Sequence, residues 1–526
     1  MATGAQRQHF TVFAALGIST SYSSIIARPT ANSGKEIIST NRKDSSDLEV
    51  KKKKTRSPGT LHLLSQACRH SARKLASSNL FITVYDNINM MIRVAEQVVG
   101  RKSRNVPLRI HSQILTFLIP DAQENGTCAT IIPLHNATLG DLETKHLDDG
   151  VMNAPLLKLE HLQLTENESQ VMHDALVHTI LSVIVRYGGE EFKQWKEELD
   201  KNVPKSDNII AVHKSKLHPL PSMEIDENTI TGNIQIIEEI NAELKLDPQN
   251  HEYQKYIKII AGDQLTIARQ RAITGIRLGH EVGLEMWKHF VLVTGLFHAK
   301  IADTHGTLQT HFGISSTRSP GSLAFHNTCL DRLPILLTSL PSFRVCRDLI
   351  MVSLYARILH CLLLVSNEDS LESYVEKVTT WKEINDHANE ILTKFANADR
   401  VQELREPRLA AEKRADAKER ANKKHKTTKA TSDGGFNNSC GTSTEDLLPT
   451  ELQGDMVFEN GCLFLQDALL TQLFADAIKS GDSGLVILVL KHWVFSFWEM
   501  AISNMPTKCC ICFTTLLMFG QRRSGM

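Results

Sequence analysis

Apolar residues recur at two spacings along this chain, and the pattern changes near residue 310. Before that point, short β-branched and aromatic runs alternate with stretches in which apolar residues fall three or four positions apart. The first pattern predicts strands and the second predicts amphipathic helices. We expect strands at 80–85, 129–134, 208–212, 257–261 and 290–297, and helices at 60–80, 168–187, 231–244 and 266–276. Such alternation is typical of a mixed α/β domain.

Beyond residue 310 the strand pattern fades and helical spacing dominates, at 333–365, 370–395, 463–479 and 484–498. Residues 401–429 are a charged run, which predicts an exposed helix of a composition also found in coiled coils. We therefore expect a helix-rich mixed α/β fold with a large helical second half. The expected parts are a partly disordered segment (1–60), a mixed α/β domain (61–310), a helical region (311–400), a charged linker (401–445), a helical segment (446–498) and a tail (499–526).

Charge and cysteine content change this picture only locally. Lys plus Arg and Asp plus Glu both number 59, so a surface for an anionic partner such as DNA has to be local. Lys51 to Arg56 suits a nuclear localisation signal or phosphate contacts, and it equally suits a solvated loop. The basic residues of 412–429 could also contact DNA phosphates, but a solvated charged face is the favoured interpretation. Ten Cys without regular spacing favour a reduced, intracellular compartment. The apolar segments 349–365 and 485–498 are interrupted by basic residues and predict buried helices, not membrane spans.

Two acids that follow apolar strands carry the candidate chemistry. Asp86 comes after FITVY, and Asp263 comes after IKIIAG. Carboxylates on neighbouring strand ends suit Mg²⁺ or Mn²⁺, and ribonuclease-H-like nucleases and transposases place their acids in this way. A third acid normally lies on a later helix, where Glu459 is our candidate and Asp467 is also available.

Backbone chemistry offers an alternative interpretation of the same acids. Asp-Asn and Gly-Asp are good turn formers, and Asp263 also reads as a helix start. His213 and His218, with nearby acids, lack the spacing of a metal site, and no phosphate-binding glycine loop points to a small-molecule cofactor. His298 lies just after the last predicted strand, where we expect a packed or hydrogen-bonded side chain.

Several blocks resemble a fungal, mainly basidiomycete, family designated domain of unknown function 6589 (DUF6589). They include GTLHLLSQACRHSARKL, VYDNINMMIRVAEQ, HPLPSMEIDENTITGNIQIIEEI, IAGDQLTIARQR, LFHAKIADTHG and GDMVFENGCLFLQDALLTQLFADAIKSGDSG. The resemblance implies no activity, because the family has no established biochemistry.

Two segments depart from the resemblance. Residues 103–120 interrupt a stretch that runs on almost directly in related chains, which suggests a retained intron or an ordinary surface insertion. From Glu499 onward the family pattern is lost, which suggests a frameshift and makes the clustered Cys509, Cys510 and Cys512 accidental. We predict a transposase-derived, metal-dependent nuclease-like protein that is inactive in this copy. The alternative is a noncatalytic helical interaction protein.

Overall fold

The described residues form two compact units. The computed structural model describes residues 60–92, 107–110, 113–116, 122–147, 158–277, 287, 289–339, 341–429 and 455–499. Unit 1 takes its described residues from Met1–Ala154 and Lys214–Gly295, and unit 2 from Pro155–His213 and Leu296–Met526. This division differs from the expected boundary near 310. The reason is helix α6 (Glu166–Tyr187), which is buried along much of its length and packs among the helices of unit 2.

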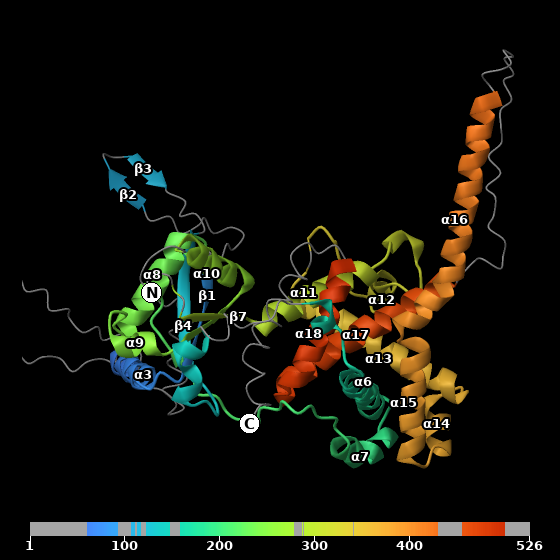
Figure 1. Ribbon diagram of the computed structural model, residues 1–526, viewed down its shortest axis with the longest axis horizontal. Helices are drawn as coiled ribbons and strands as arrows, with labels where there is room; N and C mark the ends of the chain where they lie inside the picture. The colour runs from blue at the N-terminus through green and yellow to red at the C-terminus, as the bar shows by residue number, and fades with distance from the viewer. Residues whose placement is uncertain are drawn as a thin grey trace, which may run out of the picture. The chain divides into compact units, whose positions relative to one another are not determined.

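Unit 1 is built on a five-stranded mixed sheet (Figure 1). Its strands are β1 (Phe81–Ile92), β4 (Ala122–Pro133), β5 (His218–Pro219), β6 (Lys258–Gly262) and β7 (Phe290–Thr294), in the spatial order β5-β4-β1-β6-β7. Strand β4 is antiparallel to β1 and β5, whereas β6 is parallel to β1 and β7. The sheet confirms a helix-rich mixed α/β fold.

Helices cover one face of this sheet. They are α3 (Thr60–Ala76), α8 (Ile230–Leu244) and α10 (Gln264–Ile276), with α9 (His251–Lys255) and the 3₁₀ helix η1 (Leu139–Leu142) completing the unit. Tyr85, Ile131 and Ile260 from the strands share one buried cluster with Ile236 of α8 and Ile273 of α10. Burying such side chains is worth roughly 1.5–3 kcal/mol each, which fixes α8 and α10 against the strands.

Strand β1 is longer than the sequence predicted. Asp86 and Asn87 were expected to end it, but pairing with β4 continues to Ile92, which lies opposite Ala122. Strand β4 forms backbone hydrogen bonds with β1 beyond Asp86 and Asn87. This pairing outweighs the local preference of the two residues for a turn. The small sheet of β2 (Pro107–Ile110) and β3 (Gln113–Thr116) falls in the connection beyond this last pair, within the 103–120 segment. An insertion there leaves the register of β1 and β4 unchanged.

Unit 2 is helical. Its elements are α5 (Leu159–Leu162), α6, η2 (Glu191–Trp195), α7 (Lys196–Lys201), α11 (Leu296–His311), η3 (Ser315–Thr317), α12 (Leu323–Cys329), α13 (Phe343–Ser366), α14 (Leu371–Lys377), α15 (Trp381–Phe395), α16 (Ala398–Lys429), α17 (Met456–Ser480) and α18 (Ser483–Glu499). Residues 401–429, expected to be an exposed charged helix, fall within α16 (Figure 1).

Helices α13 and α17 are long and apolar enough to cross a membrane by length and composition. Both contribute to the same buried cluster, which holds Leu354 and Ile358 of α13 together with Phe464 and Leu465 of α17. Each therefore has the packing of a core helix within this unit.

The strand predicted at 208–212 is wrong. Ile210 and Val212 are exposed, and the segment makes only an isolated bridge between Ile209 and Asp482. A β-branched run forms a strand only where a sheet edge is available to pair with it. The basic run Lys51 to Arg56, the expected loop at 430–443 and the tail from 500 onward, with Cys509, Cys510 and Cys512, lie outside the described residues.

Candidate functional site

The register of two parallel strands brings Asp86 and Asp263 to the same edge of the sheet. Val84 pairs with Ala261 in the last pair of β1 with β6, an offset of 177 residues. Continued two residues beyond that pair, the same offset would set residue 86 level with residue 263, since 86 + 177 = 263. Strand β6 ends at Gly262, so Asp263 stands at its carboxyl end while β1 runs past it. The expected convergence of these two positions thus has a structural basis in the register.

Asp263 also performs the helix-start role that the sequence left open. It is the N-cap of α10, and its Oδ1 accepts a hydrogen bond from the Thr266 backbone N–H at 2.7 Å. Such a cap is typically worth about 1 kcal/mol. Its second oxygen has no hydrogen-bond partner among the described residues, so one oxygen caps the helix and the other is available for a ligand.

Asp86 is exposed; its Oδ1 accepts a hydrogen bond from the Asn87 backbone N–H at 2.8 Å, and its backbone carbonyl accepts one from the Cys128 thiol at 3.6 Å. Across the sheet it pairs with Cys128 of β4. Burial raises the pKa of the Cys128 thiol, and the negative charge of Asp86 raises it further. The thiol is therefore a poor nucleophile at neutral pH, but it senses the charge on Asp86.

A third carboxylate, Glu227, joins the two predicted acids. It lies in the segment before α8, and only 2% of it is exposed. Its Oε1 accepts a hydrogen bond from the Thr266 hydroxyl, while its Oε2 is buried without a hydrogen-bond partner among the described residues. Burial raises the pKa of Glu227 to about 7, and the charges of Asp263 and Asp86 act in the same direction. The three acids thus lie within electrostatic reach of one another.

A buried hydrogen-bond network lies next to the acids. The Tyr85 hydroxyl donates to Asn233 Oδ1 at 2.9 Å, and the Gln270 amide donates to the Tyr85 hydroxyl. Asn233 in turn donates to the Glu227 backbone carbonyl at 2.6 Å. Burial raises the pKa of Tyr85 well above its ordinary range, and Glu227 and Asp263 contribute. Connected buried hydrogen bonds of this kind fix the backbone that carries Glu227.

The segment before α8 is also attached to strand β4. Thr127 and Met223 exchange two backbone hydrogen bonds of 2.9 Å each, and the Thr127 hydroxyl donates to the Ile225 carbonyl at 2.8 Å. Met223 is buried, and Ile225 packs against the same cluster, whereas Glu224 is exposed. This alternation in MEIDE is the sequence signal that could have identified Glu227 as the inward-facing acid.

Glu459, the predicted third acid, has a structural role in unit 2. It is buried, and both of its oxygens accept hydrogen bonds: Arg405 and Arg408 donate to Oε2 at 2.7 and 2.8 Å, and Arg408 to Oε1 at 2.8 Å. These bonds lower the pKa of Glu459 and tie α16 to α17. Asp467 also has a partner in unit 2, since its Oδ2 lies within hydrogen-bond distance, 2.7 Å, of the His311 Nε2 atom. Glu459 and Asp467 belong to unit 2, whereas Asp86 and Asp263 belong to unit 1.

The predicted histidine positions make ordinary polar contacts. His218 lies 3.0 Å from the Ser71 hydroxyl, and the His213 ring lies 2.9 Å from the Ala211 carbonyl. Among the described residues, no group of three or more His, Cys, Asp or Glu side chains is placed so that it could hold a metal ion. A cation at the acid cluster would therefore need ligands from outside the protein as well.

Comparison with known proteins gives one match. Residues 152–509 match the model of a family of unknown function, DUF6589. The matched range includes Glu227, Asp263 and Glu459 and begins after Asp86. No curated protein and no solved structure matches the chain.

Proposed function

Because the chain belongs to the DUF6589 family, whose description states no function, we propose from the site itself that unit 1 is a nuclease-like, metal-dependent domain acting on DNA phosphodiesters. Its acidic residues are Asp86, Asp263 and Glu227, at most two of which would contact one cation directly. The observation that carries the proposal is Glu227, a buried acid with one unpartnered oxygen beside two further carboxylates. Burying an acid among acids is costly, and functional sites are where proteins most often retain such an arrangement.

The sheet topology supports this class of protein. The first strand along the chain, β1, lies at the centre, β4 and β5 follow antiparallel on one side, and β6 and β7 run parallel on the other. This arrangement is similar to ribonuclease-H-like sheets, in which acids gather where the first and fourth of these strands end. Asp263 directly follows the fourth of these strands, β6, and Asp86 lies within the first, β1, which continues to Ile92. A transposase-derived origin is the corresponding proposal for the chain's history.

The donor set fits a hard divalent cation. Three carboxylates offer oxygen ligands, and Mg²⁺ is usually held by one or two carboxylates together with substrate phosphates, so a complete protein cage is not needed. When bound, Mg²⁺ or Mn²⁺ supplies Lewis-acid stabilisation of charge on the phosphodiester. Asp263 would offer the oxygen not used for capping, Asp86 its exposed carboxylate, and Glu227 its unpartnered Oε2.

Glu227 also sets the pH at which the cluster accepts a cation. With a pKa of about 7 it holds a proton on average in mildly acidic solution. That proton must leave before the carboxylate can act as a ligand, so cation binding strengthens as the pH rises through 7. Arg269 opposes the rise in the pKa of Glu227, which places a positive charge near the acids.

Turnover by this copy is a separate question. We expect it to be inactive, because we infer a frameshift in the C-terminal tail, although the family match itself continues to residue 509. The noncatalytic alternative is favoured by one observation, that Asp263 caps α10 as an ordinary helix-start acid does. The two proposals differ in whether a cation binds at the cluster.

The test uses the full chain with a variant that keeps the cap. Asp263→Asn removes the charge but preserves N-capping, because Asn caps as well as Asp. Asp455→Asn is the matched control, since Asp455 caps α17 through a bond from the Phe458 backbone N–H in unit 2. Fe²⁺ with ascorbate and peroxide should cut the parent polypeptide near residues 86, 227 and 263, and Mg²⁺ should suppress the cuts.

The outcomes separate the proposals. Localised cuts that disappear in Asp263→Asn but persist in Asp455→Asn support the metal site even without turnover. Mg²⁺- or Mn²⁺-dependent cleavage of labelled DNA that Asp263→Asn abolishes would establish an active nuclease and overturn the expected inactivity. No localised cuts and no DNA cleavage would leave the noncatalytic interaction protein as the better account.

A further inference from the structure

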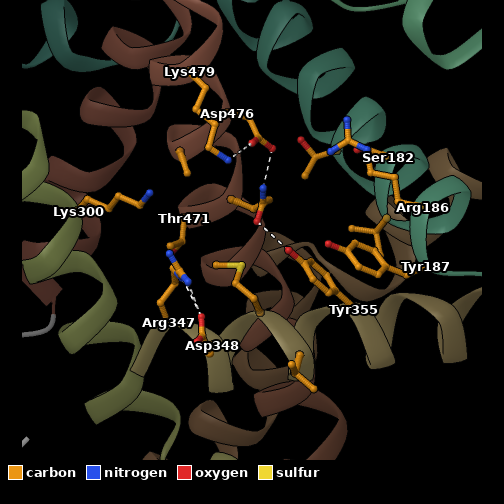
Figure 2. A pocket seen from close by; sticks show the side chains of 16 residues that line it. Ser182, Arg186, Tyr187, Lys300, Arg347, Asp348, Tyr355, Thr471, Asp476 and Lys479 are labelled. Atoms are coloured by element: carbon orange, nitrogen blue, oxygen red, sulfur yellow. Dashed lines mark hydrogen bonds and ion pairs between the residues drawn. The ribbon is translucent and has the colours of Figure 1, made fainter. Parts of the chain in front are cut away.

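Unit 2 contains a pocket lined by four helices (Figure 2). Helices α6, α11, α13 and α17 surround it, and its volume is about 450 Å³. These helices pack on one another within the unit, and the pocket floor includes the buried Thr471. A cavity of this size on a packed helical frame is within the range of small-ligand sites.

The pocket carries more positive than negative side chains. Its cations are Arg186, Lys300, Arg347 and Lys479, and its acids are Asp348 and Asp476. Asp348 pairs with Arg347 at 2.6 Å, and Asp476 pairs with Lys479 at 3.4 Å. Two of the four cations are thus in ion pairs with acids.

Lys300 and Arg186 remain without an ion pair among the described residues. Lys300 reaches only the Phe343 ring, 5.9 Å away, over which Arg347 also lies at 5.8 Å. Burial lowers the pKa of Lys300, and Lys479 and Arg347 lower it further, whereas Asp476 and Asp303 oppose the shift. The two acids offset part of the repulsion among four cations, and an anionic ligand would offset more of it.

Aromatic rings form the opposite side of the pocket. Figure 2 shows Lys300 and Arg347 on one side, and Tyr187 and Tyr355 with Arg186 on the other. The two tyrosine rings stack at 4.3 Å with an interplanar angle of 17°, and Tyr187 is exposed. An exposed ring next to an arginine is a surface on which a planar base can stack.

We infer that this pocket binds a nucleoside phosphate, with Lys300 and Arg347 contacting the phosphate and the Tyr187–Tyr355 stack receiving the base. The tyrosines favour a phosphate that carries a flat ring over an inorganic anion. The pocket volume suits one nucleotide, free or as one unit of a single strand. This binding site does not depend on the acid cluster of unit 1.

Calorimetry on the full chain tests the inference with four probes: thymidine 5′-monophosphate, thymidine, inorganic phosphate and a dT₁₂ oligonucleotide. We expect a nucleotide probe to bind with a dissociation constant below about 1 mM. Thymidine and phosphate should each bind at least about tenfold more weakly, because each lacks one half of the recognition. Lys300→Gln should weaken nucleotide binding at least about tenfold. Tyr187→Leu should weaken the nucleotide but leave inorganic phosphate unchanged.

Lys377→Gln is the matched control, since Lys377 lies in unit 2 and pairs with Glu368 away from the pocket. Binding of the monophosphate that falls in Lys300→Gln but not in Lys377→Gln identifies a free nucleotide. Binding of dT₁₂ alone, with the same response to the variants, identifies a nucleotide within a strand. Binding of neither probe, or binding that Lys300→Gln leaves unchanged, overturns the inference. Unchanged circular dichroism and melting show that each variant is folded.

Discussion

Replacing Glu227 by Gln should make the stability of unit 1, relative to the parent, more favourable at pH 8 than at pH 5. The fold raises the pKa of Glu227 from its ordinary 4.5 to about 7. A raised carboxyl pKa means that the folded state favours the protonated form. The cost to stability is therefore absent below about pH 4.5, grows between about pH 4.5 and 7, and is complete above about pH 7.

The magnitude follows from the same pKa values. The difference of about 2.5 pH units corresponds to about 3 kcal/mol, since one unit is worth about 1.36 kcal/mol. Glu227→Gln removes the charge and keeps an oxygen for the Thr266 hydroxyl. Its new amide N–H₂ stands where Oε2 has no partner, which costs roughly 1–3 kcal/mol. That amide cost is independent of pH. The free energy of unfolding of the variant minus that of the parent therefore changes between pH 5 and pH 8 only through the charge of Glu227.

Hydrogen exchange measures this locally. Two units make a single global unfolding transition unsafe, so we would follow amides of β6 by mass spectrometry, corrected for intrinsic exchange rates. The free energy of opening for Glu227→Gln, relative to the parent, should rise by about 2–3 kcal/mol from pH 5 to pH 8. Glu224→Gln, an exposed neighbour, should show no such rise. A Glu227→Gln difference that is the same at both pH values would refute the reasoning.

Two further substitutions have defined outcomes. Glu459→Gln should lower the free energy of unfolding of unit 2 by about 2–3 kcal/mol, because it leaves two arginines without their buried, charged partner. Urea denaturation measures the loss, with Glu403→Gln at an exposed position as the control. Equal losses in the two variants would contradict the prediction. Asp86→Asn should speed alkylation of Cys128 at pH 8, because removing the neighbouring negative charge lowers the pKa of the thiol. Peptide mass spectrometry measures the alkylation rate, with the exposed Cys329 as internal control. An unchanged rate at Cys128 would contradict the proximity of the two side chains.

The sequence predicts this fold well where a segment carries its own signals. Helix α8 and strand β6 were expected within a residue of their observed ends, because capping and apolar spacing act locally. Strand β5 was missed, since its two residues, His218 and Pro219, pair only because β4 lies beside them. The run at 208–212 has strand composition but no sheet edge, and the extent of β1 past Asp86 depends on β4. Such nonlocal pairing is not visible in a single segment.

The candidate site was predictable in part for the same reason. The predicted strand ends identified Asp86 and Asp263; Asp263 does follow the end of β6, whereas β1 continues past Asp86 to Ile92. Glu459 was chosen because it stands on a later helix, but two arginines bind it within unit 2. Glu227 precedes a helix in an acid-rich segment, and its importance comes from burial against Thr266, a contact between residues 39 positions apart.

Binding of Mn²⁺ tests the central proposal, a cation site formed by the three acids, most directly. Calorimetry on the full chain at pH 6 and pH 8 should show saturable binding that is about tenfold tighter at pH 8, because a carboxyl with a pKa of about 7 is mostly protonated at the lower pH and mostly ionised at the higher. Asp86→Asn should abolish it, and Asp247→Asn, at an exposed turn of unit 1, should not. Absence of saturable binding at both pH values, or binding that survives Asp86→Asn, would contradict the proposal.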